Sequence, residues 1–345
     1  MNTRVETMVD SLSGYKASIE KLSLLLKKLK NVNWNEKFWS SLRILMLPTI
    51  AVMVFLSLWG LVASQIHTSL GQLPGPSQVF EQTLVLVDEH NEERSKEVAF
   101  YERQEKRNAA KLISNPDAKV KIRAYTGKAT FIDQIGTSVI TVVTGFILAS
   151  LIAIPIGIFC GLSTSVYQAL NPLIQTFKPV SPLAWLPIVT MIVSAVYVSD
   201  DPAFSKSFLN SAITVMLCCM WPTIINTTVG VSSIDNDLVN VGRVLRLSWY
   251  TRIIKIVLPS SIPMMFAGLR VSLGVGWMVL IAAEMLAQNP GLGKFVWDEF
   301  QNGSSNSLAR IMVAVFAIGL IGFLLDRFML MLQRHVSWDK TSIIR

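Results

Sequence analysis

The feature that most constrains the fold of this chain is its series of long apolar segments. About 20 consecutive apolar residues form a helix that spans the roughly 30 Å hydrocarbon core of a bilayer. Segments of this kind occupy residues 44–66, 134–161, 179–199, 208–229, 262–286 and 308–331. The sequence therefore predicts an all-α, polytopic membrane protein with about six transmembrane helices.

The composition supports this prediction. Of 345 residues, 51% are hydrophobic and 16% are charged, which is too apolar for an ordinary soluble enzyme of this size. The net charge of +8 comes largely from residues beside the apolar segments, so it indicates contact with the lipid bilayer and not with nucleic acid. The cysteines, Cys160, Cys218 and Cys219, lie within apolar segments and predict neither a disulfide nor a metal site.

Small residues recur at four-residue spacing in two of the predicted spans, and this pattern indicates a packed bundle. A helix surface lined with small side chains lets a second helix approach closely, in a solvent where hydrophobicity gives no gain from association. The first stripe consists of Gly145, Ala149, Ala153, Gly157 and Gly161, and the second of Gly268, Ser272 and Gly276. A single-span anchor would need no such stripes.

The N-terminal segment is expected to lie on the membrane surface. Residues 1–43 are rich in lysine and predict an amphipathic cytoplasmic helix with Trp34 and Trp39 at headgroup depth; a frayed basic tail is the alternative. We expect Pro48 in the first turn of the first span, at residues 44–66, where its missing N–H is harmless. The first forty or so residues are polar, so no cleavable signal peptide is expected.

Residues 67–131 form a predicted periplasmic insertion. Charged pairs at i,i+4 spacing indicate a solvated helix over residues 92–112, and period-two alternation indicates a short strand over residues 119–126. The basic residues between 119 and 128 suggest either an acidic partner or an ordinary solvated surface.

The distribution of charge predicts the orientation of the spans. The loop at residues 200–207 contains two aspartates and one lysine, whereas the loop at residues 230–261 contains the basic residues Arg243, Arg246, Arg252 and Lys255. With an even number of spans, the positive-inside rule places the loop at 230–261, the tail at 332–345 and both termini in the cytoplasm.

That loop also carries the most specific pattern in the chain, NVGRVLRLSWYTRIIKIVLP at residues 240–259. We expect a short helix from Asn240 to Arg252 that docks on a partner, followed by a break at Leu258-Pro259 where the fifth span begins. The alternative is a solvated basic helix that touches lipid headgroups. The residues expected to make or support the contact are Asn240, Gly242, Arg243, Arg246, Trp249, Tyr250, Leu258 and Pro259.

The pattern resembles the cytoplasmic loop of ABC-importer permeases, in which Glu-Ala-Ala precedes a glycine and, later, Ile-x-Leu-Pro. Ile256, Leu258 and Pro259 match, whereas Asn240 replaces the usual glutamate and Arg246 the usual glycine. Strings that extend the resemblance over roughly residues 72–332 are LPGPSQVF, AIPIGIFCGLS, LNPLIQTFKPVSPLAWLPI, AGLRVSLGVGWMVLIAAEMLA and NPGLGKFVWDEFQ. The chain thus resembles permeases of the nitrate, sulfonate and taurine group of type I ABC importers, with the nitrate branch most similar.

The resemblance implies a fold, partners and a substrate. The fold is a MetI-like bundle with a five-helix permease core at residues 132–331, in the inner membrane of a bacterium. The partners are ABC ATPase subunits on the cytoplasmic loops, a periplasmic substrate-binding protein and a second permease copy. The implied substrate is a small anion, with nitrate, nitrite or cyanate first and taurine, alkanesulfonates or bicarbonate as alternatives.

The chain has no ATPase motif of its own. In the string NPGLGKFV, Phe295 follows the glycine–lysine pair, and Gln288 stands where a P-loop would begin with glycine. Scattered histidines predict no zinc site, and no cofactor is expected. ATP hydrolysis would come from a separate partner, and the chain itself is not expected to be an enzyme.

A membrane pathway for a small anion needs hydrogen-bond donors and a cation that offsets the loss of hydration. The candidates in the spans are the donors Ser181, Trp185, Thr190 and Thr214, the cation Arg270 and a second ionisable residue, Glu284. Charged residues within a membrane are functional candidates. The alternative is that these side chains make ordinary hydrogen bonds or ion pairs between helices.

Two other classes of protein are weaker alternatives. A sensor or scaffold would use residues 67–131 as an external ligand-binding module, but an anchor needs no helical loop followed by Leu-Pro. A secondary transporter would require a matching pair of broken helices in the two halves, and the sequence shows no such pair.

Overall fold

The computed structural model describes residues 34–68, 71–115, 120, 122–198, 203–304 and 306–336. The chain divides into two compact units, Met1–Ile66 and His67–Arg345. Among its described residues, the first unit contains helix α2 (Trp34–Ala63), whose stretch Met46–Ala63 is long and apolar enough to cross a membrane. The first predicted span is confirmed in this sense.

Helix α2 begins earlier than the sequence suggested. Pro48 lies inside the helix and not in its first turn, because the polar residues from Trp34 onward are already helical. The expectation for Pro48 is therefore wrong. The surface helix expected in the N-terminal segment lies outside the described residues up to position 33, and residues 34–43 belong to α2.

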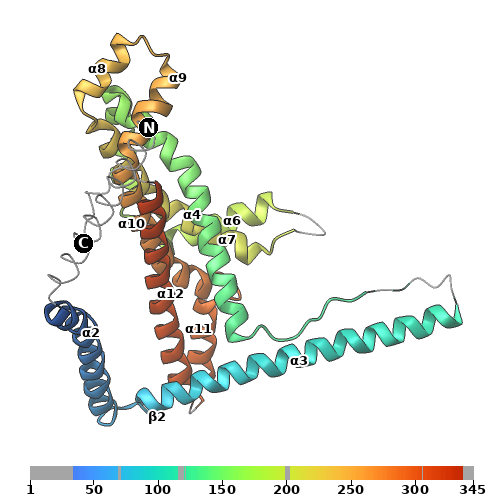
Figure 1. Cartoon of the computed structure of the whole chain (residues 1–345). Coiled ribbons are helices and arrows are strands. Elements are labelled where there is room, and N and C mark those ends of the chain that lie inside the picture. The colour runs from blue at the N-terminus through green and yellow to red at the C-terminus, as the bar shows by residue number, and fades with distance from the viewer. Residues whose placement is uncertain are drawn as a thin grey trace, which may run out of the picture. The chain divides into compact units, whose positions relative to one another are not determined.

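The second unit is a helical bundle (Figure 1). Its elements are the antiparallel strands β1 (His67–Thr68) and β2 (Gly71–Gln72) and the helices α3 (Pro76–Ser114), α4 (Phe131–Leu162), α5 (Thr164–Phe177), α6 (Pro182–Val196), α7 (Lys206–Ser232), α8 (Asn236–Val244), α9 (Trp249–Arg252), η1 (Ile253–Val257), α10 (Leu258–Ala287), α11 (Leu292–Asn302) and α12 (Ser307–Val336). Within the described residues of the whole chain, five helical segments could each cross a membrane, or six if α5 and α6 form one broken span.

Helix α7 is the centre of the bundle and packs against both α4 and α10. The small-residue stripes explain how the three helices approach so closely. A Cβ on Gly145 would lie 2.6 Å from the carbonyl oxygen of Ala212, and one on Gly157 would lie 2.9 Å from that of Ile224. A Cβ on Gly276 would overlap the sulfur of Cys219. The prediction that these stripes hold a bundle together is confirmed, with α7 as their shared partner.

The third predicted span, residues 179–199, contains a single helix, α6, but this helix is shorter than a full span. Helices α5 and α6 meet at a bend of 100°. Pro182 starts α6, and the side chain of Ser181 caps it by accepting a hydrogen bond from the backbone N–H of Leu183. With 15 residues, α6 is about 22 Å long at 1.5 Å per residue, which is too short to cross the hydrocarbon core.

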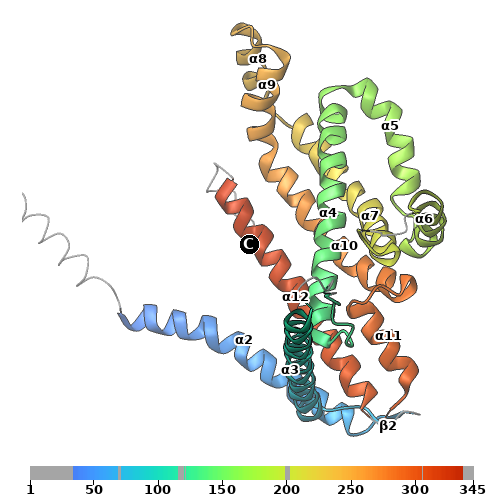
Figure 2. The same ribbon diagram turned by 90° about the vertical axis from the view of Figure 1, so that its right-hand side faces the viewer.

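Helix α3 forms an arm at the end of the bundle where α11 lies. Its 39 residues correspond to about 58 Å, and Figures 1 and 2 show it running across the bundle axis. The predicted solvated helix over 92–112 is confirmed as part of this longer helix. Gly75 and Pro76 start it, because a proline at the first helical position loses no intrahelical hydrogen bond.

The strand predicted over residues 119–126 is wrong in its described part, which is extended but pairs with no strand. Instead, the carboxamide of Gln104 on α3 donates to the carbonyl oxygen of Arg123 at 3.2 Å and accepts from its N–H at 2.9 Å. The hydroxyl of Tyr101 accepts from the N–H of Tyr125 at 3.1 Å. Side chains of the arm thus satisfy the backbone groups that a second strand would otherwise bond.

Candidate functional site

The loop between α7 and α10 folds into two short helices, α8 and α9, followed by the π-helical turn η1. We call residues 236–257 the corner element. The carboxylate of Asp235 caps α8 and the hydroxyl of Ser248 caps α9, so each helix starts at its own polar residue. The single helix predicted from Asn240 to Arg252 is therefore wrong, because the chain turns a corner after Val244.

The corner is a left-handed residue at Arg246, with φ of 47°. The N–H of Arg246 donates to the carbonyl oxygen of Arg243 at 3.0 Å, and that of Leu247 donates to Gly242 at 3.1 Å. These two bonds form a Schellman motif, which normally ends in glycine because other residues lose about 1 kcal/mol in this conformation. The structure thus explains why a glycine is expected at this position of the pattern, and arginine occupies it under strain.

Gly242 lets α8 and η1 approach closely within the corner element. A Cβ on Gly242 would lie 2.9 Å from Cδ1 of Ile256, so a larger residue would push α8 away from η1. The expected break at Leu258-Pro259 is wrong, since the chain is helical from Trp249 to Ala287. The wider turns of η1, in which the N–H of Leu258 donates to Ile253, precede the proline and accommodate its ring.

Five of the eight predicted contact residues are exposed on this element, whereas Gly242 is buried and Leu258 and Pro259 begin α10. Asn240 and Arg243 on α8 and Arg246 at the corner are exposed, and Tyr250 on α9 is 68% exposed. Trp249 stacks on Phe159 of α4 at a centroid distance of 6.2 Å and an interplanar angle of 18°. Figure 1 shows α8 and α9 at the tip of the bundle. A face that exposes aromatic, aliphatic and basic side chains together is typical of a protein-binding surface.

The predicted pathway residues on α6 lie around the bend. Ser181 is used as a helix cap, and Thr190 is half-buried. Trp185 packs against Phe177 of α5 with ring centroids 5.8 Å apart. Its indole nitrogen is buried and has no hydrogen-bond partner in the described part of the chain. A buried donor without a partner costs free energy, so Trp185 is the member of this group that most clearly lacks a structural explanation.

The other three predicted pathway residues are engaged elsewhere in the bundle. Thr214 is buried and donates to the carbonyl oxygen of Asn210 at 2.7 Å. Arg270 forms a bidentate ion pair with Asp326 of α12. The Nη2 atom of Arg270 lies 2.9 and 3.2 Å from the two carboxylate oxygens of Asp326. Glu284 lies near the C-terminal end of α10, away from Arg270. The six candidates therefore do not converge on one site, and the charge of Arg270 is offset by its partner.

Glu284 is fully buried and caps helix α11. Its carboxylate accepts from the N–H of Gly293 at 3.0 Å and from the hydroxyl of Ser138 on α4 at 2.8 Å. That same hydroxyl accepts from the N–H of Leu292 at 2.8 Å. The first N–H groups of a helix have no intrahelical partner, and the positive end of the helix dipole favours a carboxylate there.

Sequence reasoning missed the residues that complete this cluster. A Cβ on Gly291 would overlap the Glu284 carboxylate, and Asn289 donates to the hydroxyl of Thr141 on α4 at 3.3 Å. The string NPGLG was available as a signal, since a turn rich in glycine and proline between helices indicates a close backbone approach. Among the described residues, no group of three or more His, Cys, Asp or Glu side chains is placed to hold a metal ion.

Comparisons with known proteins agree with this architecture. Residues 153–338 match the family described as "Binding-protein-dependent transport system inner membrane component". The nitrate import permease protein NrtB of Synechocystis sp. is 32% identical over 84% of this chain and 88% of its own length. The bicarbonate transport system permease protein CmpB of Synechococcus elongatus is 33% identical over 85% and 89%.

Among solved structures, an inward-facing conformation of the MetNI methionine ABC transporter shares the fold. The TM-score is 0.52 at 10% sequence identity, and the match covers 60% of this chain and 96% of the other. The all-α, MetI-like bundle predicted from the sequence is confirmed.

Proposed function

The chain belongs to the family of binding-protein-dependent transport system inner membrane components, and we propose that it forms the membrane pathway of an importer for a small monovalent oxyanion, with nitrate as the first candidate. It is a multi-pass permease subunit of an ABC transporter and not an enzyme, because separate ATPase subunits hydrolyse ATP in such transporters. Its family also implies a substrate-binding protein as a partner.

The two groups of relatives support the substrate class. One is named for nitrate and the other for bicarbonate, at nearly equal identity over nearly the same share of the chain. Both ions are planar oxyanions with one negative charge. Nitrate is placed first because the string KPVSPLAWLPIVTMIVSAVYVSDDP and the start of the corner element resemble the nitrate branch.

Uptake by the assembled transporter tests this proposal. The permease is reconstituted in vesicles with its ATPase and its binding protein, and accumulation of isotopically labelled nitrate, bicarbonate and taurine is compared with and without ATP. We expect ATP-dependent accumulation of nitrate, with bicarbonate as a weaker substrate and taurine excluded. Uptake of taurine in preference to nitrate would place the chain on the sulfonate branch.

The bent segment favours a second copy of the chain beside α6. Irregular backbone at membrane depth is tolerated only where protein covers it or where it lines a water-filled cavity. Met191 and Val196 on α6 are 66% and 80% exposed. We propose that a second permease copy covers this face, so that the pathway runs between the bends of two copies.

The positions of the ends of the bundle support the proposed orientation. Figures 1 and 2 show the corner element at one end of the bundle and α11 at the other, with α12 running back toward the corner element. We propose that the corner element and the C-terminal tail face the cytoplasm, where ATPase subunits dock, and that α3 faces the binding protein.

The arm has a charge pattern that suits a docking role. Its root is held to the bundle, because Arg94 pairs with Asp133 of α4 at 3.1 Å and Arg310 of α12 bonds to Glu89. The hydroxyl of Tyr125 donates to Glu93, and this bond holds the pKa of that carboxyl below its usual value. From residue 102 onward the helix instead exposes four basic side chains, Arg103, Lys106, Arg107 and Lys111, beside the two carboxylates of Glu102 and Glu105.

Reversing the charge of these four exposed residues to glutamate is expected to weaken the binding protein's stimulation of ATP hydrolysis. The apparent affinity of the permease for the binding protein should fall by about tenfold at low salt. The dependence of this affinity on salt should largely disappear, because exposed charges act mainly through long-range attraction that salt screens. The pair of substitutions Arg103→Lys and Arg107→Lys keeps the charge and serves as the control. Unchanged affinity and salt dependence in the reversed variant would exclude this surface as the docking site.

A further inference from the structure

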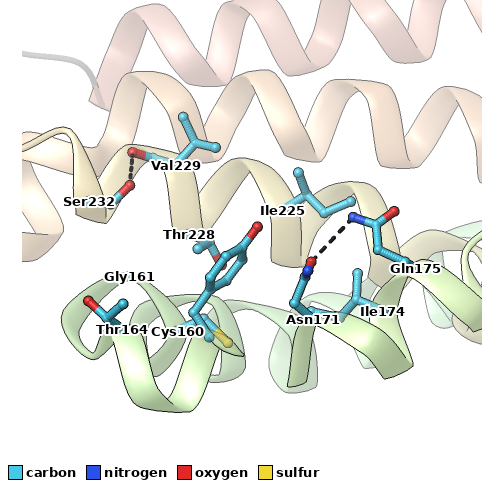
Figure 3. Close-up of a pocket in the computed structure, with 11 residues that line it drawn as sticks. Cys160, Gly161, Thr164, Asn171, Ile174, Gln175, Ile225, Thr228, Val229 and Ser232 are labelled. Atoms are coloured by element: carbon cyan, nitrogen blue, oxygen red, sulfur yellow. Dashed lines mark hydrogen bonds between the residues drawn. The ribbon is translucent and has the colours of Figure 1, made fainter. Parts of the chain in front are cut away.

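A cavity of about 330 Å³ lies between the C-terminal end of α4, helix α5 and the C-terminal half of α7 (Figure 3). No residue of the predicted pathway lines it. Cys160 and Gly161 line it from α4, Thr164 lines it from the start of α5, and Thr228, Val229 and Ser232 line it from α7. The volume exceeds that of one water molecule, about 30 Å³ in the liquid, by roughly tenfold, so a small hydrated ion fits.

Helix α5 presents a stripe of neutral polar side chains to this cavity. Tyr167, Asn171 and Gln175 follow one another at four-residue spacing, which places them on one face of the helix. Figure 3 shows Asn171 and Gln175 projecting toward α7, with the amide nitrogen of Gln175 3.3 Å from the side-chain oxygen of Asn171. This bond orients the Asn171 carboxamide and leaves its own amide nitrogen free to donate.

The two walls differ in the hydrogen bonds they can offer. On α7, the hydroxyl of Thr228 already donates to the carbonyl oxygen of Ile224 at 2.8 Å, and that of Ser232 donates to Val229 at 3.1 Å. The donors available to a ligand therefore come from α5, as the hydroxyls of Thr164 and Tyr167 and the two carboxamides. No lysine, arginine, aspartate or glutamate is among the described residues that line the cavity.

Neutral donors without a fixed charge suit one kind of ligand. They stabilise a single negative charge by hydrogen bonding while holding it weakly enough to leave, which conduction requires. A doubly charged ion would lose more hydration than such donors replace. The cavity also ends at Ser232, immediately before the turn into α8, so it lies at the end of the bundle that carries the corner element.

We propose that this cavity is a binding site for monovalent oxyanions at the corner-element end of the pathway, with Tyr167, Asn171 and Gln175 as the donors. The proposal rests on the function proposed above. It adds a step of ion binding at residues that the sequence analysis did not select. The site would hold the ion after it passes the α5–α6 bend and before it is released.

Protection of an introduced cysteine tests the site directly. Ser232→Cys places a thiol in an exposed position of the cavity wall, whereas Cys160, Cys218 and Cys219 are buried and common to all variants. The assembled transporter is labelled with a small uncharged thiol reagent in the presence of nitrate, bicarbonate or sulfate. Nitrate at about twice its dissociation constant should slow labelling about threefold, because only the unoccupied fraction reacts.

The variants separate the site from the overall transport function. Asn171→Leu and Gln175→Leu, each combined with Ser232→Cys, should abolish protection by nitrate, whereas Thr176→Val, on another face of α5 and outside the cavity lining, should preserve it. Equal protection by sulfate, or no protection by any ion in a transporter that still imports nitrate, would overturn the site. Intact protection without uptake of nitrate or bicarbonate would support the site and refute the proposed function.

Discussion

Replacing Trp249 with alanine is expected to abolish substrate-stimulated ATP hydrolysis by the assembled transporter while the bundle stays folded. Trp249 is 53% exposed and is held flat against Phe159, so it offers a rigid aromatic surface at the tip of the molecule. Aromatic residues of this kind dominate binding energy, and truncating one commonly costs about 2 kcal/mol or more. We therefore expect a loss of stimulation of roughly 30-fold or more, measured as ATPase rate with and without the loaded binding protein.

Two control variants decide whether docking is the cause. Trp249→Phe keeps an aromatic ring on Phe159 and should retain most of the stimulation. Phe300→Ala removes an exposed aromatic side chain from α11, at the other end of the bundle, and should have little effect. Full stimulation in the Trp249→Ala transporter would show that the corner element does not carry the signal.

Arg246 allows the backbone of the corner to be separated from its charge. Arg246→Gly removes the guanidinium but relieves the left-handed strain, which should stabilise the loop by about 1 kcal/mol. Arg246→Ala removes the guanidinium and keeps the strain. Loss of stimulation in both variants would identify the charge as the contact, whereas loss in the glycine variant alone would identify the shape of the corner.

Glu284→Ala is expected to lower the stability of the folded permease by about 3–5 kcal/mol, because buried groups that bond to the carboxylate lose their partner. The N–H of Gly293 and the hydroxyl of Ser138 would then face a cavity. At about 2–4 °C per kcal/mol, the midpoint of thermal unfolding in detergent should fall by about 6 °C or more. Gly291→Ala should act in the same direction, since its Cβ would overlap the carboxylate.

This second prediction also separates a structural role of Glu284 from the pathway role suggested by its position in a span. Glu284→Gln retains a side-chain oxygen for Gly293 and should lose less stability than the alanine variant. Leu286→Ala changes an exposed neighbour on the same helix and should leave the midpoint nearly unchanged. A Glu284→Ala permease with normal stability but slow uptake would contradict the capping role and favour the pathway role.

Some expectations were accurate because they depend on residues close together in the chain. The spans follow from the summed hydropathy of consecutive residues, and the small-residue stripes follow from helical periodicity. The stripe ending in Gly157 and Gly161 did mark a helix contact, although the sequence did not say that α7 was the partner. The glycine position of the loop pattern likewise marked the corner, although not the two helices that meet there.

Hydropathy and helical spacing, which depend on neighbouring residues, determined by themselves that this chain is a helical membrane bundle. The resemblance of its local motifs to a known family indicated the ABC permease type. The tertiary structure alone decided the partners of the buried polar groups, because these depend on where whole helices pack. Arg270 meets Asp326 across 56 residues of sequence, and Glu284 meets Ser138 across 146. The bend between α5 and α6 was also hidden, since two apolar helices with the same hydropathy can continue straight or turn by 100°.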